Sequence, residues 1–289
     1  FSTNWSLNSL LIIINPEKTR VFLVGVPQLL HKLPPMSNYL LEKEITPAPA
    51  AKDLGVFIDQ SLTYNDHAAK TTSNCLFKLI QISRMKYPLG RKSLILLMNA
   101  FVFSKLFYCS TVWANTFQGN VKKLQLEQNF AARIVLGLRK YDHISKFIRS
   151  LNWLTVKDRL LLNDAVMVFK CLNDLVPKYL ANIFVPRSHI HTRTTRSCNL
   201  LHIPRCRLSY GQRSFTYRGC KLWNCISNDL KAADSVNSFR RSLSQKLLFR
   251  LESNAEKLIM TTNRIIWLLF IGTIPEFIRS GKRTIQNCL

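Results

Sequence analysis

The stretch RKSLILLMNAFVFSKLFYCSTVW, residues 91–113, decides how the rest of this chain can fold. Its apolar residues recur at helical spacing, and the opposite side of the same helix is apolar as well. Between Lys92 and Lys122 the only charged residue is Lys105. A helix that is apolar on all sides must be enclosed by protein or lipid. Because polar residues such as Asn99 and Ser110 interrupt the run, the pattern favours enclosure by protein.

The stretch that follows, ANTFQGNVKKLQLEQNFAARIVLG (residues 114–137), indicates a polar turn and then a second helix from about Val121 to Leu136. One face of this helix is predicted to be buried: Val121, Leu124, Gln128, Ala131, Ala132 and Val135. Lys123 and Glu127 are expected to pair on its solvent side. Gly137 is a suitable residue to end it. We therefore predict a helical hairpin around which the rest of the chain packs.

Outside the hairpin, the pattern predicts strands first and helices afterwards. Strands are predicted at Thr19 to Gly25, Tyr39 to Thr46 and Leu54 to Asp59. From Asp66 the apolar period becomes helical, and this helix ends near Tyr87. Further helices are predicted at about His143 to Ser150, Val156 to Asn173, Gly211 to Ile226 and Ser235 to Phe249. The predicted fold is α+β and predominantly α-helical, with a small antiparallel sheet followed by a helical bundle.

The composition along the chain divides it into four regions. Residues 1–60 carry the short predicted strands, and residues 61–174 form the predicted helical bundle. Residues 175–250 are predicted to form a basic C-terminal module. Residues 251–289 receive no assignment. The apolar run from Ile265 to Ile271 is too short to cross a bilayer, which needs about 20 apolar residues.

The charge balance points to a polyanionic partner. The chain has 41 Lys and Arg residues against 16 Asp and Glu, a formal net charge of +25. This favours nucleic acid first and an anionic membrane surface second. The 8 cysteines are scattered, and no secretory leader precedes them. We expect reduced thiols in an intracellular protein of the nucleus or cytoplasm.

The basic charge is concentrated where acidic residues are missing. No Asp or Glu occurs between Asp174 and Asp229. The candidate nucleic-acid-binding residues in this window are Arg187, Arg193, Arg196, Arg205, Arg207, Arg213, Arg218 and Lys221. Such cations neutralise phosphates, and the interleaved aromatic residues can stack on unpaired bases. The alternative is a solvated loop and a helix whose aromatic residues belong to the core; we expect Phe215 and Trp223 to point inward.

Motifs for metal binding or acid–base chemistry are weaker. A group of possible ligands occurs at His189, His191, Cys198, His202 and Cys206, but its spacing lacks the tight pairs typical of zinc sites, so we predict no metal. The pairs Asp66-His67 and Asp142-His143 each precede a predicted helix, where an Asp side chain caps backbone N–H groups. Cys220 and Cys225 are predicted to be core thiols beside Trp223. We predict no catalytic residue.

The order of several segments then resembles one family. The matching segments are INPEKTRVFLVG (14–25), AKDLGVFIDQSLTYNDH (51–67), SKLFYCSTVW (104–113), LEQNFAARIVLG (126–137), LNWLTVKDRL (151–160), PKYL (177–180), YGQRSFTYRGCKLWN (210–224) and SFRRSLSQKLL (238–248). Together they resemble the C-terminal part of the reverse transcriptase of non-LTR (LINE-type, jockey-like) retrotransposons. One departure is Phe107, which stands where the family usually has an Asp.

The resemblance implies a chain that starts just after the polymerase active site and binds RNA and DNA as template and primer. The family's catalytic Asp-Asp pair is absent from this sequence. The nearest carboxylates, Asp53 and Asp59, are interpreted as edge and turn residues. Mg²⁺ is expected for the full-length parent, but we expect no cofactor, no small-molecule substrate and no membrane partner for this chain alone.

Two alternatives to template–primer binding stay open at this point. One is a non-enzymatic helical interaction protein whose positive charge is incidental. The other is a degraded copy of the element without function. Whether the chain is itself part of an active enzyme is left open by the sequence.

Overall fold

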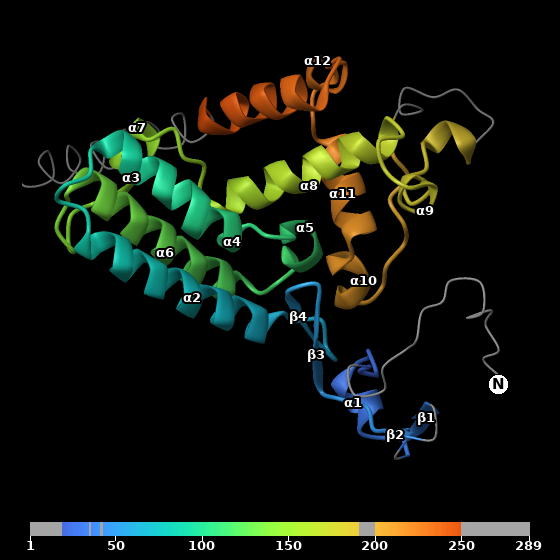
Figure 1. Cartoon of the computed structure of the whole chain (residues 1–289). Helices are drawn as coiled ribbons and strands as arrows, with labels where there is room; N and C mark the ends of the chain where they lie inside the picture. Colours follow the sequence, from blue (N-terminus) through green and yellow to red (C-terminus); the bar gives the residue numbers. More distant parts are fainter. Residues whose placement is uncertain (1–18, 35, 41–42, 191–199, 250–289) are drawn as a thin grey trace, which may run out of the picture.

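The computed structural model describes residues 19–34, 36–40, 43–190 and 200–249 (Figure 1). The elements in chain order are α1 (Pro27–Leu30), β1 (Asn38–Leu40), β2 (Lys43–Ile45), β3 (Ala50–Asp53), β4 (Val56–Asp59), α2 (Asn65–Arg84), α3 (Arg91–Leu97), η2 (Met98–Phe103), α4 (Ser104–Leu106), α5 (Ser110–Trp113), α6 (Gln118–Leu136), α7 (Ser145–Ser150), α8 (Val156–Leu172), α9 (Lys178–Ala181), η3 (Arg187–His189), α10 (Ser209–Arg213), α11 (Phe215–Asn224) and α12 (Asn228–Lys231). A further helix covers residues 236–249. The predicted class is confirmed: the fold is α+β and predominantly helical.

The strands form two short antiparallel hairpins, β1–β2 and β3–β4, and their positions differ from the prediction. Residues 19–25 are not a strand; single backbone hydrogen bonds hold them, from Ala48 N to the Val21 carbonyl and from Gly25 N to the Gln60 carbonyl. In the predicted strand at Leu54 to Asp59, the first two residues are instead the turn of the hairpin. Leu54 and Gly55 both have positive φ, 42° and 90°, which reverses the chain and pairs β3 with β4.

The central stretch is helical, as predicted, but it is neither continuous nor enclosed on all sides. α3, a π-helical segment η2 and α4 follow one another directly, and the chain then breaks at Cys109, whose φ is 45°, before α5. One face is buried: Leu94, Met98, Val102 and Leu106. The other face is open, with Leu96 69% and Phe101 51% exposed. Leu96 and Phe101 therefore do not contribute to the core of the described chain, whereas Phe103 and Phe107 pack against it.

Helix α6 confirms the predicted buried face and corrects the predicted ion pair. All six of the residues predicted to face inward are buried, and Gly137 ends the helix in the left-handed conformation, with φ 67°. Glu127, however, is only 8% exposed, and its Oε2 atom has no hydrogen-bond partner among the described residues. It does not pair with the exposed Lys123; burial instead raises the pKa of its carboxyl.

Two hydrophobic clusters divide the structure, and α8 belongs to both. Its first turns, with Val156 and Leu160, pack into the cluster formed by α2, α3–α4, α6 and α7. Its later turns, with Val168 and Phe169, pack with α11 and the helix at 236–249. Figure 1 shows α8 running from the bundle to α11. The two clusters meet within α8, before residue 174. The boundary at residue 174 stays a prediction.

We predict that Trp113→Ala lowers the free energy of unfolding by about 3–5 kcal/mol, the usual cost of deleting a buried aromatic side chain. Trp113 is 1% exposed, and its Nε1 donates to the Tyr108 carbonyl at 2.8 Å. Phe101→Ala is the matched control, because Phe101 is 51% exposed; it should cost less than about 1 kcal/mol. Urea denaturation measures both, and equal costs would contradict the orientation of the central helix.

Candidate nucleic-acid interface

The basic residues of the C-terminal module are arranged around two short helices, α10 and α11. Ser214 separates them: its Oγ accepts a hydrogen bond from Tyr217 N at 3.3 Å and caps α11. α11 then buries Gly219, Cys220 and Trp223 and leaves Lys221 exposed. The predicted helix at Gly211 to Ile226 is therefore two helices with a capped break between them.

Close packing of α11 against α8 depends on Gly219. A Cβ atom at this position would lie 2.9 Å from the Phe184 ring and 2.9 Å from a methyl group of Val168. No side chain fits in this space without displacing those neighbours. The glycine therefore lets α11 approach α8 closely enough for the polar contact described next.

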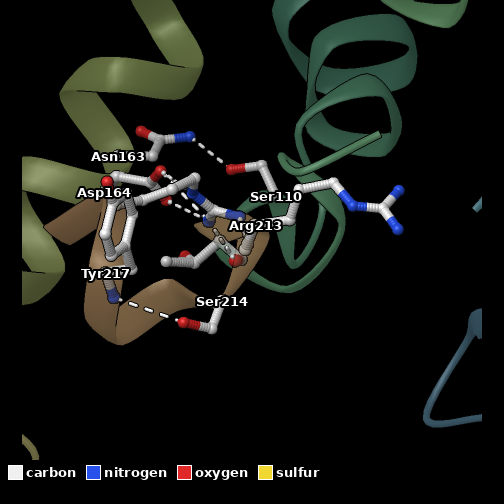
Figure 2. A network of polar contacts seen from close by, with 8 residues as sticks. Ser110, Asn163, Asp164, Arg213, Ser214 and Tyr217 are labelled. Atoms are coloured by element: carbon white, nitrogen blue, oxygen red, sulfur yellow. Dashed lines mark hydrogen bonds and ion pairs between the residues drawn. The ribbon is translucent and has the colours of Figure 1, made fainter. Parts of the chain in front are cut away.

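Arg218 joins three elements, and Figure 2 labels two of its partners, Asp164 and Arg213. Its Nε donates to Asp164 Oδ2 at 3.1 Å and its Nη2 to Asp164 Oδ1 at 3.3 Å. Nη2 also donates to the Thr111 carbonyl at 3.0 Å, and Nη1 to the Arg213 carbonyl at 3.1 Å. Beside this pair, Asn163 Nδ2 donates to Ser110 Oγ at 2.8 Å. α11 is thus tied to α8 by a two-pronged ion pair and to α5 by a hydrogen bond to the Thr111 carbonyl.

The Asp164–Arg218 ion pair is buried, and burial shifts the pKa of the Asp164 carboxyl. Asp164 is 4% exposed. Burial raises the pKa of its carboxyl to about 6, although Arg218 acts in the opposite direction through its charge and hydrogen bonds. Arg218 was a candidate nucleic-acid ligand, but its guanidinium is committed to Asp164 and two carbonyl groups. The geometry gives it a structural role, and we remove it from the set of residues proposed to contact phosphate.

The other candidate residues have different surroundings. Arg205, Arg207 and Lys221 are exposed, and the Lys221 ammonium lies 5.7 Å from the centre of the Tyr217 ring. Arg187 is half-buried in η3. Arg193 and Arg196 lie outside the described residues.

Arg213 lies between two aromatic rings. Its guanidinium carbon is 4.7 Å from the centre of the Tyr210 ring and 5.5 Å from that of Phe117, at the start of α6. Its Nε and Nη1 atoms are buried without a hydrogen-bond partner among the described residues. A cation held by aromatic faces, with unsatisfied donors, gains stability from an anionic acceptor.

The loop that carries Arg205 and Arg207 is anchored at its start. Leu201 N donates to Asn224 Oδ1, and Asn224 Nδ2 donates back to the Leu201 carbonyl, both at 2.9 Å. His202 N also donates to the Val185 carbonyl at 2.8 Å. The first two bonds attach the loop to the end of α11, and the third attaches it to the segment after α9.

A groove of about 520 Å³ lies between α8, α10 and α11. Arg213, Tyr217 and Lys221 line it, and the Asp164–Arg218 pair also contributes to its surface. The structure therefore brings two candidate cations and an aromatic ring to one depression. We use the name basic face for six residues: Arg205, Arg207, Tyr210, Arg213, Tyr217 and Lys221.

The two carboxylates compared with the missing catalytic Asp-Asp pair belong to the β3–β4 hairpin. Asp53 and Asp59 lie at opposite ends of the β3–β4 hairpin, since Asp53 pairs with Val56 and Asp59 with Ala50. Asp59 accepts hydrogen bonds from Thr63 N at 3.0 Å, Thr63 Oγ1 at 2.8 Å and Tyr64 N at 2.7 Å. Burial acts to raise the pKa of Asp59, but these hydrogen bonds outweigh it, and the net pKa is lowered.

The two Asp-His pairs have different surroundings. Asp142 accepts a hydrogen bond from Arg139 N at 2.8 Å, in the turn before α7. Asp66 lies inside the first turn of α2, and Tyr64, the residue before this helix, donates its backbone N–H to Asp59 Oδ1. His67 is buried against Trp113, with ring centres 5.6 Å apart, and burial lowers its pKa. The prediction that Asp66 caps the helix was wrong, because Tyr64 is the left-handed residue that starts it.

Metal ligands do not gather in the described part of the chain, where no group of three or more His, Cys, Asp or Glu residues could hold an ion. Two of the five possible metal ligands named from the sequence, His191 and Cys198, lie outside the described residues. Cys220 is a buried core thiol, as predicted, and burial raises its pKa to about 11, whereas Cys225 is exposed.

Sequence reasoning missed three residues that shape the basic face: Asp164, Asn224 and Phe117. A signal for Asp164 existed, because a carboxylate stands among the core positions of α8, between Leu160 and Val168. A charge on an apolar helix face predicts a buried partner of opposite sign. The partner, Arg218, lies 54 residues further along the chain. No local pattern identifies that pairing.

Comparison with known proteins gives one relative. The chain is 28% identical over 155 residues to a protein of Drosophila melanogaster named "Probable RNA-directed DNA polymerase from transposon BS". The match covers 51% of this chain and 16% of the length of that protein. No family model matches, and no solved structure is significantly similar. The similarity supports a relationship to transposon reverse transcriptases.

Separately, no helix in the described ranges has the length and apolar character needed to span a bilayer.

We predict that Arg218→Met lowers the free energy of unfolding by about 3–5 kcal/mol at pH 8, because it leaves a buried carboxylate without its partner. The cost should be smaller at pH 5. Losing Arg218 removes an interaction that lowers the folded-state pKa of Asp164, so that pKa rises further above its unfolded value. Relative to the parent chain, the variant's extra cost therefore grows as pH rises from about 6, the pKa of Asp164 in the parent, toward the raised pKa, and it is small below pH 6.

Lys221→Met is the matched control, since Lys221 is exposed on the same helix; it should change stability little at either pH. Denaturation of the three proteins at both pH values measures the effect. A cost for Arg218→Met that is identical at pH 5 and pH 8 would exclude Asp164 as the titrating partner.

Proposed function

We propose that this chain is the helical, nucleic-acid-holding part of a LINE-type, jockey-like retrotransposon RNA-directed DNA polymerase, and that it follows the catalytic turn of the parent protein. The observation that carries the proposal is the basic face: cations and tyrosines gathered around α10 and α11, in a segment without a carboxylate from residue 175 to residue 228. The similarity to a transposon polymerase supports it.

In this proposal the basic face holds the template–primer through its phosphates. Arg205, Arg207 and Lys221 are exposed to solvent, where a phosphate chain can reach them, whereas Arg213 is positioned by two rings. Phosphate contacts of this kind give affinity without reading sequence. The rings of Tyr210 and Tyr217 would stack on unpaired bases, which every base accepts.

A second candidate function, a helical interaction protein without a role on nucleic acid, is favoured by one observation. α2 exposes Leu76, Phe77 and Ile80 to solvent at 40%, 59% and 39%. Their spacing places them along one side of the helix. The +25 net charge and the absence of Asp and Glu from residue 175 to residue 228 are not explained by such a surface, so nucleic-acid binding remains the main proposal.

The salt dependence of binding tests the proposal. We predict that replacing Arg205, Arg207 and Lys221 together by Ala weakens binding of every single-stranded sequence alike. Each lost phosphate contact should flatten the log–log slope by about 0.7, so the triple variant should lose a slope of about 2. Filter binding across a salt series, with two unrelated oligonucleotides, measures both quantities.

A variant with Lys86, Arg91 and Lys92 replaced by Ala removes the same number of charges near the α2–α3 connection and serves as control. It should retain most of the slope. If both triple variants lose the same slope, the binding depends on overall charge and the basic face is not the site. A parent chain whose affinity does not change with salt would exclude phosphate-driven binding altogether.

We also predict that the purified chain adds no nucleotide to a primed template in the presence of Mg²⁺. Polymerisation requires carboxylates that hold two metal ions about 3.5–4 Å apart, and the sequence contains no Asp-Asp pair. Primer extension with labelled nucleotides measures this. Incorporation that a point mutation in this chain abolishes would contradict the assignment to a region after the catalytic turn.

A further inference from the structure

A cavity of about 710 Å³ lies on a different side of α8 from the basic face. It opens between the π-helical segment η2, the loop before α8, α8 itself and the helix at 236–249. Its size falls in the range of about 300–1,000 Å³ typical of small-molecule sites. The expectation from the sequence was that this chain alone binds no small molecule, and the cavity prompts us to revise it.

The backbone around this cavity is built in an unusual way. η2 is one turn of π-helix inside an otherwise α-helical run, from Met98 to Phe103. Such turns are rare and occur frequently at functional sites. Both Asn99 and Phe103 on this turn line the cavity. On the opposite wall, Gln128 Nε2 donates to the Leu154 carbonyl at 2.7 Å, which fixes the loop that carries Trp153.

The cavity combines a cation with aromatic rings and no carboxylate. The Arg159 guanidinium lies 5.7 Å from the centre of the Phe107 ring. Phe103 packs edge-on against Trp153, with ring centres 4.7 Å apart and an interplanar angle of 87°. None of the residues that line the cavity is acidic, and Arg159 forms no ion pair or side-chain hydrogen bond with any residue in the described ranges.

A second cation, Arg240, makes the unpaired charge of Arg159 more costly. Arg240 lies on the helix at 236–249, one turn before Ser244, which lines the cavity. Burial lowers the pKa of Arg159, and the positive charge of Arg240 lowers it further. Arg159 therefore carries a poorly compensated positive charge beside an open cavity, and an anion that binds there stabilises it.

We infer that this cavity binds a nucleoside phosphate, with the phosphate at Arg159 and the base among the rings of Phe103, Phe107 and Trp153. Arg159 supplies planar donors that match phosphate oxygens. Asn99, on the π-turn, supplies an amide at the cavity wall that can bond to polar edges of a base or sugar. The nucleoside phosphate has two sources, a free nucleotide or one unit of a single strand.

This site does not depend on the proposed function, because none of its residues belongs to the basic face. The ligand chemistry is that of a nucleotide, whereas the basic face is proposed to follow a phosphate chain. A chain that binds oligonucleotides through the basic face and no nucleotide in the cavity would refute only the present inference.

Isothermal titration of the full chain with adenosine 5′-monophosphate, adenosine and inorganic phosphate tests the inference. We expect adenosine 5′-monophosphate to bind at least about tenfold more tightly than adenosine, since a charged hydrogen bond to phosphate is lost without the phosphate group. Inorganic phosphate should bind more weakly than the nucleotide, because it leaves the rings unused. Equal affinity for adenosine and its phosphate would overturn the inference, as would equal affinity for the nucleotide and inorganic phosphate.

Variants assign the binding to the cavity. Arg159→Gln should weaken nucleotide binding at least about tenfold, and Arg240→Gln should weaken it by a smaller factor. Arg84→Gln removes an exposed charge at the end of α2 and should leave the affinity unchanged. A thermal melt confirms that each variant is folded. Unchanged affinity in both Arg159→Gln and Arg240→Gln overturns the inference.

A single-stranded oligonucleotide with a 5′-phosphate distinguishes the two sources. If a strand is the source, it should compete with adenosine 5′-monophosphate in the parent chain and in the Arg205→Ala, Arg207→Ala, Lys221→Ala variant. If a free nucleotide is the source, the strand should not displace it. Either outcome supports the cavity as a nucleoside-phosphate site, provided that Arg159→Gln removes the binding.

Discussion

The contact between α8 and α11 is the constraint on which the rest of this structure depends. α8 contributes to both hydrophobic clusters, so it connects the bundle to the C-terminal module through a shared core. Gly219 lets α11 approach it, and the Asp164–Arg218 ion pair fixes the rotation of α11 about its own axis. With Cys220 and Trp223 buried, Tyr217 and Lys221 line the groove. The position of the basic face is thus a consequence of packing.

This arrangement separates charges that the sequence presents as one group. Of the eight candidate residues, Arg218 serves the fold, Arg213 is held between rings, and Arg205, Arg207 and Lys221 stay exposed. A guanidinium paired with a buried carboxylate has little left to offer a phosphate, whereas an exposed one can exchange its hydration for a phosphate contact. The proposed interface is therefore smaller than the basic window from which it was predicted.

The parts of the fold that were predictable are those fixed by local spacing. The buried face of α6, the end of that helix at Gly137 and the cap at Ser235, whose Oγ accepts from Ser238 N at 3.2 Å, all follow from residues close in sequence. The π-turn in the central helix, the exposure of Phe101 and the pairing of Asp164 with Arg218 do not. They depend on which distant segments cover each face, and an apolar residue cannot reveal whether a partner exists to cover it.

The claim that the basic face is where nucleic acid is held can be measured directly by hydrogen exchange of the full chain, with and without a single-stranded oligonucleotide at low salt. We predict that backbone amides in residues 205–221 exchange more slowly in the complex, because bound nucleic acid covers them and restrains α10 and α11. Amides on the exposed side of α2 should not change. Protection confined to α2 and α3, with residues 205–221 unaffected, would contradict the claim.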